Sequence, residues 1–330
     1  MIYTKKTIPV QQLPTGEILM IHEYNFDSGL EGKKVYIQAN LHGPEVFGTA
    51  LLTKLIEYLE KKASITGSVS MVPCANPIAV QQKSYNALTG RSNPISGINW
   101  NRIFTVDKKW KSTKEQEVYY LNQLKKSNGS IEESLAANLM LLSIGSDVIL
   151  DIHTTGNKTA PHIFTHKKSS HLFAALDPMV QILWEKDVAI GAFDESHVIP
   201  FLETLPFDKT PHAATWEVDC HGTIDREKLN NRFEQLTEFL EVVWQNKKTN
   251  PVKCVPLSQH NHLHAPIAGY YSWLVDPGST VLKNQPYATV FQPWIGKSTT
   301  LFASEPFILI GTYGIAATGA GEQIGLCVFL

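Results

Sequence analysis

Apolar residues recur with two different periods along the first 250 residues. Strand-like runs rich in apolar and β-branched residues occupy positions 34–40, 68–72 and 147–153. Apolar positions at helical spacing occupy 46–62, 131–144 and 226–246. Because strands and helices alternate along the chain, the pattern predicts an α/β fold in which helices cover both faces of a mixed, mostly parallel sheet.

The pattern changes near residue 250. The segment 247–256 carries charges, two prolines and no periodicity, as domain linkers often do. Short apolar runs separated by turn sequences such as Asp-Pro-Gly follow, and they predict an all-β unit. The first 30 residues alternate weakly around turns and predict short antiparallel strands, a β extension that precedes the main sheet. We therefore expect a larger domain over 1–252 and a small all-β domain over 253–330.

Composition and charge exclude several classes of protein. The 29 Lys and Arg residues nearly balance the 31 Asp and Glu residues, so the chain lacks the positive charge typical of nucleic-acid-binding proteins. The four cysteines form no CxxC pair, which argues against a disulfide scaffold and favours a reducing compartment. Apolar runs stop short of the ~20 residues of a membrane span, and the first residues do not resemble a signal peptide. We expect a cytoplasmic protein with no nucleic-acid or membrane partner.

His42 and Glu45 lie in a predicted turn between a strand and a helix. An imidazole and a carboxylate three residues apart can converge on one cation, although such a pair also occurs by chance, and Zn²⁺ accepts both ligand types. A catalytic zinc site takes three protein ligands, and His153 is the candidate third because it ends a strand at the same sheet edge. Asp151 lies on the same strand face, where it either orients the His153 imidazole in the second shell or is simply solvated.

Two further segments carry groups that recognise charge or transfer protons. Arg91, Asn101 and Arg102 lie in one polar loop, where the guanidinium groups either clamp an anion or remain solvated. Glu217 lies between two apolar residues, an environment that can produce a general base, although an exposed strand glutamate is the commoner case. Both segments therefore leave a functional and a structural interpretation open.

Three histidines alternate by two near the start of the all-β unit: His260, His262 and His264. In a strand they would project from one face and could imitate a metal site. A partly exposed histidine face is the simpler interpretation, because no nearby carboxylate completes a catalytic ligand set.

The order of these motifs resembles the succinylglutamate desuccinylase/aspartoacylase family, a branch of the zinc-carboxypeptidase-like hydrolases. The sequence reads HGPE at 42–45, RxNPxxGxNxNRxF at 91–104, DIHTTG at 151–156 and TWE at 215–217. The segment from His264 onward is similar to the small β-domain, akin to a biotinyl-carrier or barrel-sandwich fold, that many members carry. The resemblance implies a zinc-carboxypeptidase-like fold for residues 1–252.

The resemblance also implies a site and an activity. It implies one zinc ion per chain, bound by His42, Glu45 and His153. The remaining family roles fall on Glu217 as catalytic base, on Arg91 as the polarising arginine, and on Asn101 and Arg102 as the pair that grips a substrate carboxylate. A zinc-activated water would then hydrolyse the amide bond of an N-acyl amino acid or a related N-acylated amine.

The chain departs from the family pattern in the arginine loop. Ser96 and Trp100 replace the common Asp and Leu, which affects loop support or pocket shape rather than the proposed ligands. The residues after Arg102 also differ from those of carboxypeptidases, which loosens any inference about peptide substrates. A metallocarboxypeptidase or peptidoglycan-peptide amidase acting on a short peptide, and an inactive binding or scaffold relative, therefore remain as alternatives. A homo-oligomer is compatible with each of these.

Overall fold

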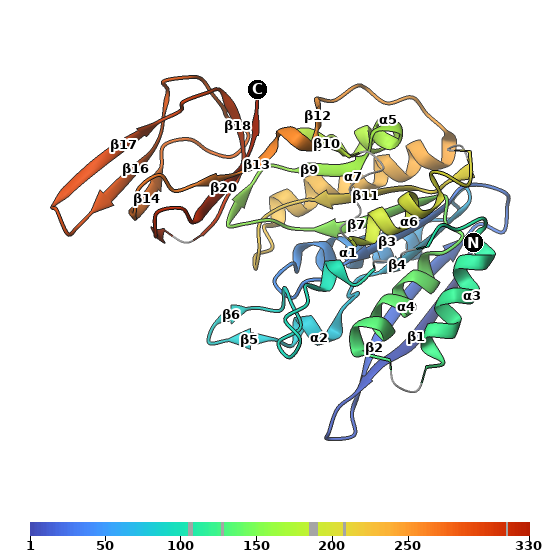
Figure 1. Ribbon diagram of the computed structural model, residues 1–330. Coiled ribbons are helices and arrows are strands. Elements are labelled where there is room, and N and C mark those ends of the chain that lie inside the picture. Colours follow the sequence, from blue (N-terminus) through green and yellow to red (C-terminus); the bar gives the residue numbers. More distant parts are fainter. Residues whose placement is uncertain (105–107, 127–128, 185–190, 207–208, 315) are drawn as a thin grey trace.

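A nine-stranded sheet forms the centre of the larger part of the chain (Figure 1). The computed structural model describes residues 1–104, 108–126, 129–184, 191–206, 209–314 and 316–330. In spatial order the strands are β1 (Ile2–Gln12), β2 (Ile18–Asp27), β4 (Ser68–Val72), β3 (Lys34–Ala39), β7 (Val148–His153), β11 (His212–Glu217), β9 (His162–His166), β10 (Val180–Trp184) and β12 (Cys254–Pro256). Neighbours pair in parallel from β4 to β11 and from β9 to β12, and antiparallel elsewhere. The expected mixed α/β sheet is confirmed.

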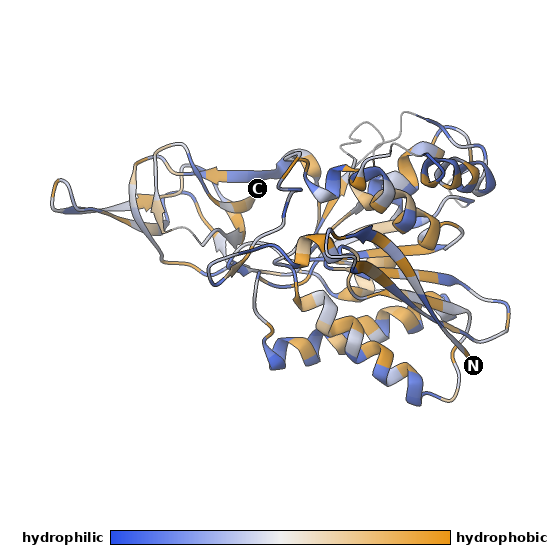
Figure 2. Cartoon of the chain, turned by 90° about the horizontal axis from the view of Figure 1, so that it is seen from below, coloured by the Kyte–Doolittle hydropathy of each residue, from blue (hydrophilic) through white to orange (hydrophobic). Residues whose placement is uncertain are grey.

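Helices cover both faces of this sheet. On one face pack α1 (Phe47–Lys61), α5 (Ser170–Phe173) and α7 (Arg226–Gln245). On the other face pack α2 (Pro77–Val80), α3 (Thr113–Leu124), α4 (Ile131–Ser143) and α6 (Phe193–Val198). Val35 and Ile37 on β3 face the first group of helices and Tyr36 faces the second, because successive strand residues point to opposite faces. Apolar colours accordingly follow the strands and the inner sides of the helices (Figure 2).

The helix ends follow local sequence signals. The Ser130 side chain accepts a hydrogen bond from the Glu133 backbone N–H, and the Glu133 carboxylate accepts one from the Ser130 N–H, so a capping box begins α4. Asn246, in the left-handed region at φ 50°, ends α7. Helices expected over 46–62, 131–144 and 226–246 are therefore observed within a residue of those limits. Among the described residues, no helix is both long and apolar enough to cross a lipid bilayer.

The C-terminal part forms two further sheets around a core of its own. One sheet contains β13 (His260–His264), β20 (Gln323–Phe329), β18 (Phe307–Thr312), β15 (Thr280–Val281) and β8 (Lys158–Thr159). The other contains β17 (Lys297–Phe302), β16 (Pro286–Gln292), β14 (Gly269–Trp273) and β19 (Ala317–Thr318). Within the described ranges, no strand pairing joins the two sheets into a closed barrel.

Strand pairing connects the two parts of the chain. β8 leaves the larger part to pair with β18, while β12, beyond residue 253, pairs with β10 of the large sheet. An apolar cluster that includes Val180, Ile182, Ile310 and Val328 fills the space between them. The C-terminal sheets are therefore held against the carboxyl end of the large sheet, beside the edge at which the strands β7 and β11 end (Figure 1).

Candidate metal centre and active site

Three buried side chains converge where β3 and β7 end. His42 and Glu45 lie in the turn between β3 and α1, and His153 is the last residue of β7. Their side chains are between 1% and 4% exposed, and their ligand atoms lie within 4.8 Å of one another. Within the ranges that the structure describes, this is the one group of three or more His, Cys, Asp or Glu residues close enough to share a cation.

Local hydrogen bonds shape the turn that carries His42 and Glu45. Asn40 adopts a left-handed conformation at φ 60°, and its Nδ2 donates to the carbonyl oxygens of His42 and Gly43. A Cβ at Gly43 would lie 2.1 Å from the Thr89 carbonyl oxygen, so this position needs glycine. The turn therefore places the His42 imidazole and the Glu45 carboxylate on the same side.

Both histidines direct the same ring nitrogen toward Glu45. His42 Nδ1 lies 2.8 Å from Glu45 Oε1, and His153 Nδ1 lies 2.7 Å from Glu45 Oε2. The opposite nitrogens have their own partners, since His42 Nε2 lies 2.9 Å from Asn99 Oδ1 and His153 Nε2 lies 2.8 Å from Asp151 Oδ2. These acceptors favour a proton on each Nε2, which leaves each Nδ1 lone pair facing the centre of the cluster.

The electrostatics of the cluster suit a cation. Burial by itself would raise the pKa of Glu45, but the charges and hydrogen bonds of His42 and His153 hold it well below its ordinary value. Burial would lower the pKa of His153, yet Asp151 and Glu45 raise it well above the usual range. Glu45 Oε2 is buried and, among the described residues, lacks a hydrogen bond of good geometry, although His153 Nδ1 is near. A divalent cation would replace the imidazolium proton and satisfy this oxygen.

A buried polar row supports Asp151 from the neighbouring strand. Gln38 on β3 lies opposite Asp151 in the parallel register, and its Nε2 donates to Asp151 Oδ1 at 3.1 Å. The Tyr36 hydroxyl in turn donates to Gln38 Oε1 at 3.1 Å. All three side chains are fully buried. Asp151 is therefore held at one oxygen by Gln38 and orients His153 with the other.

Glu217 lies beside the ligand cluster. It ends β11, directly opposite His153 in the parallel register, and its Oε2 accepts a hydrogen bond from the Thr155 hydroxyl at 2.8 Å. Burial raises the pKa of Glu217 to about 7, with the Glu45 charge adding to the rise and the charges of His153 and Arg91 opposing it. A carboxyl with such a pKa can both accept and return a proton near neutral pH.

The arginine loop lies over the same end of the sheet. Asn101 Oδ1 accepts a hydrogen bond from the Phe193 backbone N–H at 2.9 Å, while its Nδ2 lies 3.5 Å from His153 Nε2. The Arg102 guanidinium donates to the Asn101 carbonyl oxygen at 2.5 Å. Arg91 is exposed, and its charge acts on Glu217 and Arg102. The structure thus brings Asp151, Glu217 and Asn101 together with the three candidate ligands at this edge of the sheet, and the loop with Arg91 and Arg102 adjoins them.

The three alternating histidines do not form a second ligand cluster. Their ring centroids are 6.4 Å apart between His260 and His262 and 6.3 Å apart between His262 and His264. His260 packs edge-on against Phe164 of β9 with ring centroids 5.1 Å apart, so this first histidine of the row faces the large sheet. His260 therefore marks a contact between the two parts of the chain, whereas His262 and His264 are exposed, as expected of a partly exposed histidine face.

Several residues at the site escaped the sequence analysis. Asn99 and Gln38 hold the imidazole of His42 and the carboxylate of Asp151, respectively. The His221 imidazole bonds the Thr154 hydroxyl at 2.8 Å and feels the charge of Glu45. The charges of Arg91 and Glu217 both act on the pKa of Tyr313, which belongs to the C-terminal part. Asn99 lies within the arginine motif, two residues before Asn101, and His221 is one of the histidines that flank the candidate site in sequence, although no pattern fixed its direction. Gln38 and Tyr313 carried no local signal.

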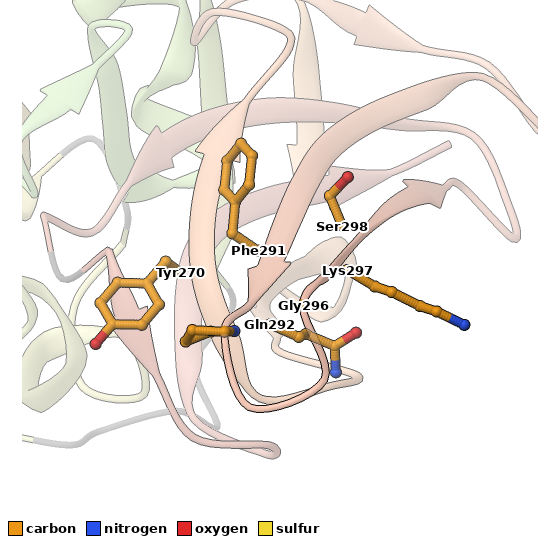
Figure 3. A pocket seen from close by; sticks show the side chains of 7 residues that line it. Tyr270, Phe291, Gln292, Gly296, Lys297 and Ser298 are labelled. Carbon is orange, nitrogen blue, oxygen red and sulfur yellow. The ribbon is translucent and has the colours of Figure 1, made fainter.

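Two hollows lie on the C-terminal part. One of about 500 Å³ is formed by β14, β16 and the β16–β17 turn, and Figure 3 shows Tyr270 and Phe291 at its wall, with the Lys297 side chain pointing away. Another, of about 310 Å³, is lined by residues that include Trp273 and Tyr313. Neither hollow is lined by a member of the ligand cluster.

A family comparison agrees with the geometry of the site. Residues 31–183 match the model of the succinylglutamate desuccinylase/aspartoacylase catalytic domain. The matched span includes His42, Glu45 and His153 and ends before Glu217. This match confirms the resemblance drawn from the motifs. No curated protein matches the sequence.

Solved structures of similar fold cover nearly the whole chain. A candidate succinylglutamate desuccinylase/aspartoacylase from Shewanella frigidimarina NCIMB 400 has a TM-score of 0.89 at 23% identity, covering 99% of this chain and 97% of that one. A candidate family protein from Shewanella amazonensis SB2B has a TM-score of 0.86 at 24% identity, covering 99% and 100%. The ectoine utilization protein EutE (DoeB) from Ruegeria pomeroyi has a TM-score of 0.71 at 15% identity, covering 99% and 95%. These similarities establish the fold of both parts.

Proposed function

We propose that this protein is a zinc-dependent hydrolase that cleaves the amide bond of an N-acyl amino acid or a related N-acylated amine. One observation carries the proposal: both histidine Nδ1 atoms face the Glu45 carboxylate while both Nε2 atoms are held by outer partners. Two imidazole nitrogens and one carboxylate are a ligand set found in catalytic zinc sites. The buried Glu45 Oε2, which has His153 Nδ1 at 2.7 Å but no hydrogen bond of good geometry from the described residues, also fits a cation.

Zinc bound by His42, Glu45 and His153 would supply a Lewis acid that polarises the scissile carbonyl and acidifies a water. Glu217 then accepts a proton from the attacking water, because its raised pKa makes it a base near neutral pH. The same carboxyl returns the proton to the leaving amine when the C–N bond breaks. Thr155 keeps the Glu217 carboxylate in place during both transfers.

Charged groups of the arginine loop would orient the substrate. Arg91 acts electrostatically on Glu217, so its guanidinium is near enough to stabilise negative charge that develops on the substrate carbonyl oxygen. Arg102 would bind a substrate carboxylate with two parallel hydrogen bonds. Asn101 Oδ1 already accepts a hydrogen bond from the Phe193 backbone N–H, so its Nδ2 group is the part that would help Arg102 to bind the substrate carboxylate. A carboxylate held in this way would fix the amide over the ligand cluster.

The family match supports a small N-acyl amino acid as the substrate. Desuccinylases and aspartoacylases, for which the matching model is named, release an amino acid from its acyl group. We also propose that residues 1–252 form the hydrolase domain and that residues 253–330 form a small β-domain of the biotinyl-carrier or barrel-sandwich type. Two antiparallel sheets around one apolar core support this second part. A cytoplasmic location stays a prediction.

Metal analysis combined with an amine-release assay tests this function. We expect one zinc per chain after loading, and release of amine from N-acetyl- or N-succinyl-amino acids that a chelator abolishes. His153→Ala should lose the zinc, whereas His22→Ala, which removes an exposed histidine on β2, should keep it. Glu217→Gln should keep the zinc and lose about 10²–10⁴-fold in kcat.

Three results would contradict the proposal. Full zinc stoichiometry in His153→Ala would remove this residue from the ligand set. Normal turnover by Glu217→Gln would remove the base. Faster release of C-terminal residues from peptides than of amines from N-acyl amino acids would replace the substrate class with that of a metallocarboxypeptidase.

A further inference from the structure

The middle histidine of the β13 row contacts a tyrosine that belongs to the active-site edge. His262 Nδ1 lies 3.1 Å from the Tyr313 hydroxyl oxygen, and the two rings are nearly parallel, at 24° and with centroids 6.3 Å apart. β20 lies between β13 and β18 in the sheet, and Tyr313 directly follows β18. The Tyr313 backbone N–H also donates to the Ile324 carbonyl oxygen at 3.0 Å. The sheet therefore holds the His262 ring and the Tyr313 hydroxyl in contact.

Tyr313 follows a residue that is hydrogen-bonded to the segment holding Glu217. The Asn157 backbone N–H donates to the Thr312 carbonyl oxygen at 3.0 Å, and Thr155, two residues before Asn157, donates its hydroxyl hydrogen to Glu217 at 2.8 Å. Burial raises the pKa of Tyr313, and the charges of Arg91 and Glu217 are both near enough to act on it in opposite directions. Arg91 also acts on His262. Tyr313 is thus an uncharged phenol at neutral pH, and its hydroxyl has His262 on one side and the Arg91–Glu217 end of the site within electrostatic reach.

We propose that His262 is a positioning residue that fixes the direction of the Tyr313 O–H bond. The His262 ring lies beside the imidazoles of His260 and His264 and the Tyr313 hydroxyl, and the charge of Arg91 acts on it. The Nδ1 atom of a neutral imidazole can accept a hydrogen bond from the phenolic O–H, which keeps its proton. The Tyr313 oxygen then presents only lone pairs to the active site, where they can accept a hydrogen bond from an N–H group of a bound amide.

The contact gives the C-terminal part a role in the reaction. Without an acceptor at His262, the phenolic O–H would rotate freely and point toward the catalytic groups for part of the time. Loss of one hydrogen bond with a net value of about 1 kcal/mol lowers a rate or equilibrium constant about fivefold. Loss of the orientation of Tyr313 should therefore lower kcat/KM by about five- to tenfold. The activity part of this inference rests on the proposed amide hydrolysis, whereas the contact itself does not.

Matched variants at residue 262 test the positioning. Asn Oδ1 reaches the place of the histidine Nδ1, so His262→Asn keeps an acceptor there, whereas His262→Leu removes it. With zinc-loaded protein and N-acetyl-L-aspartate or N-succinyl-L-glutamate at pH 7.5, we expect His262→Leu and Tyr313→Phe each to lower kcat/KM about five- to tenfold. The double variant should lose no more than Tyr313→Phe, because His262 acts through this tyrosine. The kcat/KM of His262→Asn should stay within about threefold of the native value. The control variant His264→Leu should have the same kcat/KM as the native protein.

Two results of these assays would overturn the proposal. If His262→Leu were as active as the native protein, the histidine would not position Tyr313. If the double variant lost the product of the two single effects, the residues would act independently.

A spectroscopic readout separates this inference from the proposed function. In protein labelled with ¹⁵N-histidine at pH 7.5, the resonance that His262→Leu removes identifies the His262 ring. Tyr313→Phe should shift the Nδ1 signal of this ring, because it removes a hydrogen bond to that nitrogen. An unchanged Nδ1 signal would overturn the contact even if the enzyme cleaves N-acyl amino acids. A native protein that cleaves none of them would refute the proposed hydrolysis, and a shifted signal would still support the contact.

Discussion

The buried polar row behind His153 gives a quantitative prediction for Gln38→Leu. Gln38 is fully buried and uses both ends of its amide, accepting from the Tyr36 hydroxyl and donating to Asp151. Leucine has a similar volume, so the substitution leaves no large cavity. It does leave the Tyr36 hydroxyl and one Asp151 oxygen without their partners. The variant therefore isolates the loss of two buried hydrogen bonds.

The size of the effect follows from the two orphaned groups. A buried polar group without a partner costs about 1–3 kcal/mol, so the two orphaned groups in Gln38→Leu should lower the free energy of unfolding by about 2–6 kcal/mol. Tyr36→Phe removes only the first bond and leaves one buried group, Gln38 Oε1, without a partner, so it should cost about 1–3 kcal/mol. Substitution of an outer partner of a metal ligand typically weakens metal binding 10–100-fold, and Gln38 is one step further away. We therefore expect the zinc Kd of Gln38→Leu to rise about three- to tenfold.

Urea unfolding and metal titration check both numbers. The unfolding should be measured with chelator present, because a bound metal stabilises the folded state by mass action and would mix the two effects. Zinc affinity is then measured by competition with a chromophoric chelator, with Tyr36→Phe as the matched control. An unfolding free energy within about 0.5 kcal/mol of the native value, together with an unchanged zinc Kd, would refute the argument that Gln38 holds Asp151.

Three further predictions concern other parts of the molecule. Burial raises the pKa of Asp194 to about 7, so the folded carboxyl keeps its proton at pH values where the unfolded one has lost it. Asp194 by itself should therefore lower stability by up to about 1.4 kcal/mol per pH unit between pH 5 and 7, and the unfolding free energy of the native protein relative to Asp194→Asn, measured in urea, should fall with that slope because Glu217 contributes equally to both proteins; a difference independent of pH would contradict this. A Cβ at Gly48 would lie 2.7 Å from the Ala39 side chain and 2.9 Å from that of Ile152. Gly48→Ala should therefore lower the free energy of unfolding by about 1–2 kcal/mol, although alanine has the higher helix propensity. A raised midpoint of urea unfolding would contradict this. Arg102→Ala should raise KM about tenfold for an N-acyl amino acid and leave KM unchanged for its carboxamide; equal effects on both substrates would remove Arg102 from carboxylate binding.

The main secondary structure elements were predictable because the hydrophobic pattern records which face of an element is buried. The run at 147–153 predicted a strand, and β7 spans Val148–His153. The alternation of this strand also placed Asp151 and His153 on one face, as observed. The first 30 residues, expected to hold short strands, instead form two long ones, Ile2–Gln12 and Ile18–Asp27. Most residues of these two strands are exposed, so the sequence carries little hydrophobic pattern there. Backbone pairing across the hairpin sets the length of the strands.

Part of the candidate site was also predictable, because some chemical groups lie close together in the sequence. His42 and Glu45 share one turn, and a strand end is the expected place for His153. The outer partners could not be found in this way. Gln38 contacts Asp151 across 113 positions of sequence, and Tyr313 contacts His262 across 51. No local pattern marks such pairs, since each residue by itself resembles an ordinary strand or loop residue.

The sequence by itself determined the alternation of strands and helices, the change to an all-β part near residue 250, and the ligand types of the candidate metal site. These properties depend on local spacing, which the hydrophobic period and the chemistry of each side chain record directly. Only the tertiary structure decided that both Nδ1 atoms face Glu45, that Asp151 is held by Gln38, and that the C-terminal sheets bring Tyr313 to the site. These properties depend on strand order and register, which arise from packing of the whole chain and bring together side chains that are far apart in sequence.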